Sequence, residues 1–143
     1  MLVKEAMNRN VKTIRPEDTV KNAAQIMNEN RIGSLIVVSG TGEINGILTE
    51  RDILTDVVAA GRNAEDVKVE EIMTKELITI SSEKTLEEAA DVMVSHKIKK
   101  LPVVEKERLV GIITATDLIS YENKLIEKVS TILTVSPMER IGG

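Results

Sequence analysis

Residues 46–52 read Gly-Ile-Leu-Thr-Glu-Arg-Asp, and residues 111–117 read Gly-Ile-Ile-Thr-Ala-Thr-Asp. Both stretches follow the pattern Gly-Ile-x-Thr-x-x-Asp, and they stand 65 positions apart. In each, an apolar segment runs into polar residues, which is typical of a strand that leads into a helix. A chain that carries this element twice is expected to contain two similar structural units.

The repeat extends over most of the chain that precedes each of these elements. The corresponding segments, each 66 positions apart, are Val3-x-Glu5-x-Met7 and Val69-x-Glu71-x-Met73, Thr13-Ile14 and Thr79-Ile80, Ala23-Ala24-x-x-Met27 and Ala89-Ala90-x-x-Met93, and Leu35-Ile36-Val37-Val38 and Leu101-Pro102-Val103-Val104. The change in spacing falls in a turn-rich connection at 39–43, where a length difference is well tolerated. A repeat of this length predicts two modules packed as a pseudo-dimer, with any site present in two related but unequal copies.

Length and composition limit the class of protein. Half of the 143 residues would be only marginally stable alone, so the two halves are expected to share a core. The net charge of −4 and the single aromatic residue, Tyr121, argue against nucleic-acid binding, which relies on basic surfaces and stacking platforms. The sequence has no cysteine, no membrane-length apolar run and no apolar signal segment, so we predict no disulfide, no metal site, no membrane span and a cytoplasmic location.

Each half is predicted to fold as β-α-β-β-α, which gives an α+β fold. The expected strands cover about 11–14, 35–38 and 44–48 in the first half and 77–80, 101–104 and 109–113 in the second. A capping box at 85–88, Thr-Leu-Glu-Glu, begins the second-half helix. The predicted units are 1–62 and 63–128, with a linker at 62–66. Residues 129–143 form a tail, for which packing on the body or on a second subunit and a frayed terminus are both open.

The Thr-x-x-Asp ends of the opening motif have a structural and a functional interpretation. Structurally, Thr49 and Asp52, like Thr114 and Asp117, have the spacing of a helix cap. Functionally, a helix N-terminus suits a phosphate, and a nearby carboxylate can accept hydrogen bonds from a ribose diol. The two interpretations are compatible. The motif is weak when taken singly and specific when it occurs twice at matching positions.

The full set of segments resembles a CBS-domain pair, also called a Bateman module, over about residues 3–122. The resemblance implies two motifs packed sheet to sheet with pseudo-twofold symmetry, and two clefts that bind adenine nucleotides or adenosyl compounds. It also implies that each cleft joins the ribose-binding Asp of one motif to the adenine pocket of the other. The implied residues are Thr49, Asp52, Thr79, Ile80, Ile98, Lys99, Lys100 and Pro102 for the first cleft, and Thr13, Ile14, Ile32, Gly33, Ser34, Thr114 and Asp117 for the second.

The two implied clefts differ in charge. Lys97, Lys99 and Lys100 surround the expected phosphate position of the first cleft, whereas Gly33 and Ser34 stand at the corresponding place of the second. We therefore expect the Asp52 cleft to be the better site for a charged nucleotide. The alternative is that these lysines only form a solvated strand edge that resists aggregation.

No set of residues in the sequence indicates catalysis. There is no nucleophile paired with a base, and the lone histidine, His96, has no orienting partner nearby in sequence. The sequence thus predicts a stand-alone, non-catalytic regulatory module that needs no cofactor and binds AMP, ADP, ATP or S-adenosylmethionine. The resemblance implies a homodimer stacked through helices and an unknown regulated protein as partner. The alternatives are a constitutive oligomerisation or scaffold protein with empty clefts and, more weakly, a nucleic-acid binder.

Overall fold

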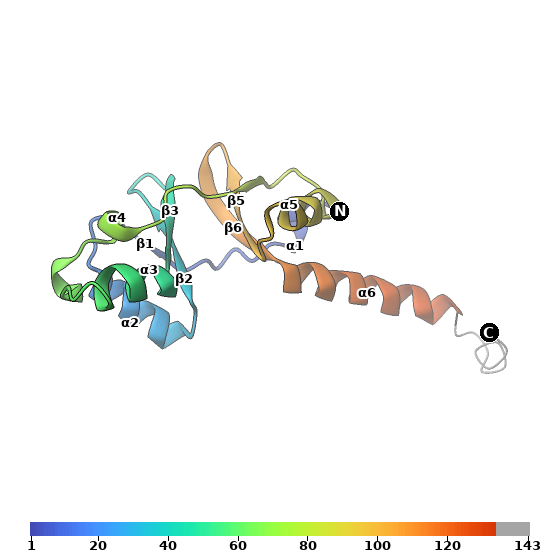
Figure 1. Cartoon of the computed structure of the whole chain (residues 1–143). Helices are drawn as coiled ribbons and strands as arrows, with labels where there is room; N and C mark the ends of the chain where they lie inside the picture. The colour runs from blue at the N-terminus through green and yellow to red at the C-terminus, as the bar shows by residue number, and fades with distance from the viewer. Residues whose placement is uncertain (134–143) are drawn as a thin grey trace.

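The computed structural model describes residues 1–133, which form two three-stranded sheets with helices packed on them (Figure 1). The first half contains α1 (Val3–Ala6), β1 (Thr13–Ile14), α2 (Val20–Asn30), β2 (Ser34–Val38), β3 (Ile44–Thr49) and α3 (Glu50–Ile53), which continues as a π-helical turn over Leu54–Val58. After a 3-10 turn at Ala64–Asp66, the second half contains α4 (Val69–Ile72), β4 (Ile80–Ser81), α5 (Leu86–His96), β5 (Lys100–Glu105), β6 (Arg108–Thr114) and α6 (Ala115–Leu133). The predicted linker at 62–66 thus contains a short helical turn.

The two sheets have the same topology. In the first, β2 is central, parallel to β1 and antiparallel to β3, and β5 takes the same place between β4 and β6. Even the irregularity in the ladder recurs, after Val37 in β2 and after Val103 in β5. The prediction of an α+β fold from two β-α-β-β-α repeats is confirmed, and each repeat gains a one-turn helix at its start.

The opening helices are exchanged between the halves. Val3 and Met7, from the start of the first repeat, belong to the core of the second sheet. Val69 and Ile72, from the start of the second repeat, belong to the core of the first sheet. Figure 1 shows α1 beside β5, β6 and α5, and α4 beside β1 and β3. Each half therefore closes the core of the other, which fixes how the two sheets sit together.

Matching backbone hydrogen bonds hold both exchanged segments. The amide of Val3 donates to the carbonyl of Lys84 at 2.7 Å, just before α5 begins. The amide of Val69 donates to the carbonyl of Asp18 at 2.8 Å, just before α2 begins. Each opening segment is thus fastened to the first turn of the long helix in the opposite half.

The repeated Val-x-Glu-x-Met pattern follows from this exchange. Val3 and Val69 are fully buried, because they are the residues that enter the opposite core. The carboxylate of Glu5 accepts the amide of Leu2 at 2.7 Å, and the carboxylate of Glu71 accepts the amide of Lys68 at 2.6 Å. Each glutamate therefore satisfies an amide that the start of a one-turn helix leaves without a partner.

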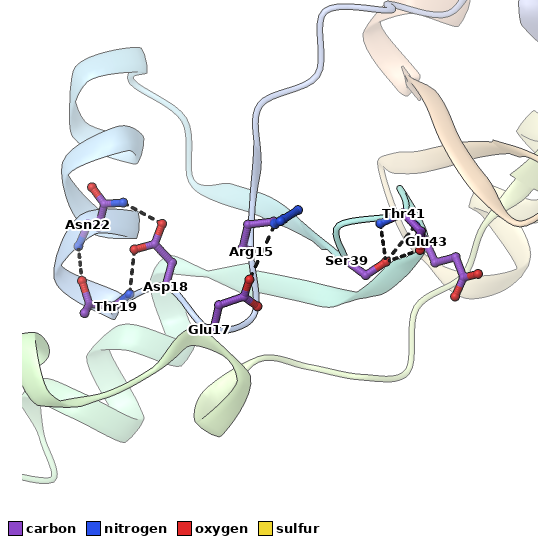
Figure 2. A network of polar contacts seen from close by, with 8 residues as sticks. All are labelled: Arg15, Glu17, Asp18, Thr19, Asn22, Ser39, Thr41 and Glu43. Atoms are coloured by element: carbon purple, nitrogen blue, oxygen red, sulfur yellow. Dashed lines mark hydrogen bonds and ion pairs between the residues drawn. The ribbon is translucent and has the colours of Figure 1, made fainter.

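Side-chain caps set where the longer helices begin. The hydroxyl of Thr85 accepts the amide of Glu88 at 3.1 Å, and the carboxylate of Glu88 accepts the amide of Thr85 at 3.2 Å, as the capping box predicts. In the first half, Thr19 accepts the amide of Asn22, and Asp18 binds both the amide of Thr19 and the side chain of Asn22 (Figure 2). The threonine cap is thus the same in both halves, and only the residue that accepts its own amide differs, Asp18 in the first half and Glu88 in the second.

The last helix is longer than the sequence predicts. α6 runs to Leu133, so 129–133, assigned above to a tail, are helical. Residues 134–143, the rest of the predicted tail, lie outside the described residues. Figure 1 shows α6 leaving the second sheet and running away from the body. Among residues 1–133, no helix combines the length and the hydropathy that a membrane crossing requires.

Candidate functional site

The two Thr-x-x-Asp turns have nearly the same geometry. Asp52 accepts the amide of Thr49 through Oδ2 at 3.0 Å, and the amide of Asp52 donates to Thr49 Oγ1 at 3.1 Å. Asp117 and Thr114 make the same two bonds at the same two distances. The reciprocal cap that the spacing predicts is therefore present in both halves, and it orients each carboxylate at the carboxyl end of a strand.

The cap leaves fewer free amides at these helix starts than the phosphate interpretation assumes. The amide of Glu50 donates to the carbonyl of Gly33 at 3.0 Å, and the amide of Ala115 donates to the carbonyl of Lys99 at 2.8 Å. Together with the amide of each aspartate, two of the first three amides in both helices are satisfied by the protein itself. The helix dipole remains, but charged side chains become more important for holding an anion.

The glycine of each motif allows a close approach by the exchanged segment. A Cβ on Gly46 would lie 2.5 Å from the carbonyl oxygen of Thr74, and one on Gly111 would lie 2.6 Å from Sδ of Met7. Those contacts come from the residues that follow α4 and α1, and paired backbone bonds join Thr74 to Ile47 and Asn8 to Ile112. The motif therefore needs glycine so that the crossing segments can pass over the strand.

A cavity of about 180 Å³ lies between the halves on the Asp117 side. Its wall combines the crossing segment that follows α1, the start of β2, and the ends of β5 and β6. The lining residues are Asn8, Asn10, Val11, Lys12, Ile32, Ser34, Ile36, Lys100, Ile112 and Thr114. Thr114 is the hydrogen-bond partner of Asp117, so this carboxylate stands one helical turn from the cavity.

The environment of the two aspartates differs at one position. The hydroxyl of Thr74 lies 3.3 Å from Oδ1 and 3.4 Å from Oδ2 of Asp52 and donates to this carboxylate. Asn8 is the residue that corresponds to Thr74, and its side chain instead accepts the amide of Asn10 at 2.9 Å. Within residues 1–133, Oδ1 of Asp117 accepts no hydrogen bond from the protein. Asp117 therefore has a free acceptor, whereas Asp52 has part of its capacity filled.

Most of the residues implied for the second cleft meet in one place. Ile32, Ser34 and Thr114 line the cavity together, Asp117 is bonded to Thr114, and Gly33 lies between two of the lining residues. Thr13 is exposed and follows the lining residue Lys12. Ile14 is different, because its side chain is buried in the first core.

The residues implied for the first cleft are more dispersed. Ile80 packs in the second core and, with Thr79, borders a cavity of about 400 Å³ formed with α5, whose lining includes neither Thr49 nor Asp52. Ile98 packs against the second core, Lys99 is exposed and Pro102 is buried. Lys100 pairs with Thr114 in the sheet and lines the Asp117 cavity. The charge difference inferred above therefore weakens, since one of the three lysines borders the opposite cleft.

Several lining residues were not predicted. Asn8, Asn10, Val11 and Lys12 enter the cavity because the chain crosses between the sheets after α1. Their sequence signal is weak, since they stand in an irregular segment between a one-turn helix and a two-residue strand. Ile36, where the second half has Pro102, is buried and lines the cavity rather than either core. Knowing that the opening segments are exchanged would have pointed to these residues.

The side chains available at the cavity suit an organic ligand better than a metal ion. The lining has four aliphatic residues and two lysines, while Asp117 is the acceptor next to it. Across the part of the chain that the structure describes, no three carboxylate or imidazole groups are placed to hold a metal ion. A molecule with a flat apolar part, a hydroxyl-bearing part and an anionic part matches this arrangement.

Comparison with known proteins identifies the family. The model of the CBS domain matches residues 3–59 and again 69–124, so this chain belongs to the CBS domain family and carries two CBS motifs. The CBS domain-containing protein YhcV of Bacillus subtilis is 37% identical over 116 residues, which are 81% of each chain. Two relatives that are enzymes, an inosine-5'-monophosphate dehydrogenase of Korarchaeum cryptofilum and a homoserine O-acetyltransferase of Methanosarcina acetivorans, match this chain through 23% and 21% of their own length.

Solved structures agree with the fold. A putative acetoin utilization protein of Vibrio cholerae superposes with a TM-score of 0.81 at 29% identity, covering 92% of this chain and 96% of its own. The CBS domain pair of protein MJ0100, solved with 5′-methylthioadenosine and S-adenosyl-L-methionine, gives a TM-score of 0.71 at 30% identity over 87% of this chain and 97% of its own. The chain is thus a tandem CBS pair, the class of protein that the repeat predicts.

Proposed function

We propose that this protein is a non-catalytic regulatory module that binds an adenine nucleotide or an adenosyl compound between its two CBS motifs and signals to a partner protein. The observation that carries the proposal is the cavity built from both halves beside the free acceptor of Asp117. A ligand in such a place contacts both motifs at once, so binding can shift the population of their relative arrangements. A related CBS pair that was solved with two adenosyl compounds supports the ligand class.

Each part of the proposed ligand has a matching group. The aliphatic residues Val11, Ile32 and Ile36 would enclose the adenine ring, because the chain offers no aromatic residue there. The carboxylate of Asp117 would accept hydrogen bonds from the ribose diol. Lys12 and Lys100 would pair with a phosphate or carboxylate. The cavity is smaller than the roughly 300 Å³ at which sites for drug-sized ligands begin, so it would hold the base while the rest lies in the open cleft.

We propose the Asp117 cleft as the tighter site, which reverses the ranking that the lysine count alone suggests. Thr74 already donates a hydrogen bond to the Asp52 carboxylate. Lys100, one of the three lysines expected near the Asp52 cleft, borders the Asp117 cavity instead. Both effects lower the expected affinity of the Asp52 cleft for a ribose and a phosphate. The first cleft remains a proposed site of lower affinity.

Calorimetric titration of AMP, ATP and S-adenosylmethionine tests both statements. Asp117→Asn keeps an acceptor for the helix cap and removes the charge, and Asp52→Asn is its matched control in the other half. We expect Asp117→Asn to weaken the tighter binding event at least tenfold and Asp52→Asn to leave it nearly unchanged. If Asp52→Asn weakens the tighter binding event and Asp117→Asn does not, the Asp52 cleft is the tighter site, as the lysines in the sequence suggest. An absence of binding and of any thermal shift with these compounds at millimolar concentration would instead favour the scaffold alternative.

The predicted homodimer, the regulated partner and the cytoplasmic location remain parts of this proposal. An apolar groove of about 540 Å³ lies between α2 and α3, and Leu54 and Val58 beside it are more than half exposed. We assign the predicted helix-to-helix stacking of two modules to this groove. Val58→Asp should abolish that stacking, which sedimentation velocity would detect as a loss of mass.

A further inference from the structure

The second half of α6 has an apolar face that nothing in residues 1–133 covers. Every residue of α6 is exposed or half-buried, although the helix carries seven large aliphatic residues. Exposure is high at its far end, where Ile132 and Leu133 are 69% and 67% exposed. Exposed apolar surface of this kind on a helix that leaves the body indicates contact with another helix.

The apolar residues of α6 follow a seven-residue repeat. The pairs Leu118-Ile119, Leu125-Ile126 and Ile132-Leu133 recur every seven positions, with Val129 between the last two pairs. This spacing keeps one face of a helix in contact with a partner helix along its length. We call these seven residues, together with Glu122, the α6 stripe. Glu122 is the charged member of the stripe.

The α6 stripe is complementary to itself when the helix is reversed. Turning a second copy about the midpoint between Leu125 and Ile126 places Leu118 opposite Leu133. The same operation places Ile119 opposite Ile132. Every apolar pair of the stripe therefore meets an apolar pair, in the isologous arrangement that a twofold axis requires. Leu118, at the end of the stripe nearest the body, also packs partly against the second core, so the contact depends mainly on Ile119, Leu125, Ile126 and Ile132.

Charge distinguishes the antiparallel pairing from the parallel one. In a parallel pair Glu122 would face Glu122 of the second copy inside an apolar contact, which is unfavourable. In the antiparallel pair Glu122 lies opposite Val129 of the second copy, beside Lys128 at the border of the stripe and about 10 Å along the axis from the second Glu122. Within the described chain neither Glu122 nor Lys128 has an ion-pair partner. The reversed second copy supplies a partner for each.

We propose that α6 is a dimerisation helix that pairs antiparallel with α6 of a second copy of this chain, centred between Leu125 and Ile126. This interface is separate from the α2–α3 groove assigned to module stacking. It therefore joins CBS modules end to end, and with both surfaces in use it would link stacked pairs into larger assemblies. The proposal does not depend on which ligand the clefts bind.

Sedimentation velocity on the full chain tests the interface. Ile126→Asp places a charge at the centre of the α6 stripe, and Ser120→Asp places the same charge on the opposite face of α6. We expect Ile126→Asp to weaken self-association at least tenfold, and Ser120→Asp to leave it unchanged, with circular dichroism showing both variants folded. A wild-type chain that stays monomeric, or an assembly that both variants affect equally, overturns the proposal.

Cysteine substitution tests the orientation, because the natural chain contains no cysteine. Two copies of Ile126→Cys would meet at the centre of an antiparallel pair and form a disulfide on oxidation. Two copies of Leu133→Cys would stand about 22 Å apart along the helix axis and would not. Crosslinking of both variants would indicate a parallel pair and contradict the proposal, and crosslinking of neither would show that this face of α6 does not pair with itself.

Discussion

The two Thr-x-x-Asp turns agree to a tenth of an ångström in their cap hydrogen bonds but differ in what faces them. The Asp52 turn faces Thr74, whose hydroxyl donates to the carboxylate. The Asp117 turn faces Asn8, and within residues 1–133 no protein group donates to Oδ1 of this carboxylate. The repeat thus preserves the frame of the site, and the exchanged segments decide how much of each carboxylate a ligand can use.

The same comparison applies to the glycine of each motif. The atom closest to a Cβ on Gly46 is the backbone oxygen of Thr74 at 2.5 Å, whereas on Gly111 it is Sδ of Met7 at 2.6 Å, with the backbone oxygen of Asn8 farther away at 3.0 Å. A backbone oxygen cannot move without shifting the crossing chain, whereas Met7 can change rotamer. A side chain added at Gly46 should therefore destabilise the protein more than one added at Gly111.

Gly46→Ala should have the largest effect on stability. A Cβ 2.5 Å from the carbonyl of Thr74 forces the segment after α4 away from β3, and we expect a loss of about 3 kcal/mol. Gly111→Ala should cost about 1–2 kcal/mol, because Met7 can give way. Urea unfolding of both variants measures the difference. Equal losses would mean that the two crossing segments yield to the same extent.

Truncating the exchanged valines should destabilise the opposite half. Val3→Ala and Val69→Ala each remove two buried methyl groups, so each should cost about 2 kcal/mol in unfolding free energy. Hydrogen exchange should locate the effect: Val3→Ala should lower amide protection in β5 and β6, and Val69→Ala should lower it in β2 and β3. Loss of protection within the residue's own half would contradict the exchange.

The exchange marks the limit of what the sequence predicts. Local signals were sufficient for the elements, since the cap at Thr85, the apolar face of α5 and the strand of β2 depend on neighbours in sequence. They cannot show that Val3 packs under β6, because the buried face of a one-turn helix looks the same whichever sheet covers it. The lining residues Asn8 and Lys12 were missed for this reason.

The sequence indicates the parts of the candidate site that lie within one motif. It does not indicate which residues of the two halves come together. Thr114 and Asp117 were found from spacing, because the cap is local. The resemblance implied that Lys100 belongs to the Asp52 cleft, yet its cross-strand neighbour is Thr114. Strand register, which sequence spacing does not reveal, therefore decides which cleft a strand-end residue borders.

Exchanging the facing residues should shift the relative affinity of the clefts. Thr74→Ala removes the donor to Asp52 and should tighten ligand binding there about three- to tenfold, since one hydrogen bond is worth roughly 0.5–1.5 kcal/mol. Asn8→Thr should weaken binding at Asp117 by a similar factor if its hydroxyl takes the place that Thr74 has in the other half. Calorimetry on both variants measures the two shifts. Unchanged affinities would show that the facing residue does not control the carboxylate.

The left-handed residues at the ends of α2 and α5 should behave alike. Arg31 and Lys97 have φ of 52° and 54°, a conformation in which a Cβ is unfavourable and glycine is preferred. Arg31→Gly and Lys97→Gly should each raise the unfolding free energy by about 0.5–1 kcal/mol. Urea unfolding of the two variants measures both changes. If the denaturation midpoint rises in only one variant, the side chain replaced in the other variant makes a compensating contact.

Glu71 gives the smallest expected effect, one that depends on pH. The amide of Lys68, and then the guanidinium of Arg62, hold the pKa of Glu71 below its usual range. A lowered folded-state pKa contributes stability that is present above the unfolded-state value of about 4.3 and is lost as the pH falls through the folded-state value. Glu71→Gln should therefore flatten the decline of unfolding free energy in acid, and Arg62→Met should flatten it less. If Arg62→Met has the larger effect of the two, the ion pair rather than the amide of Lys68 dominates the behaviour of this carboxylate.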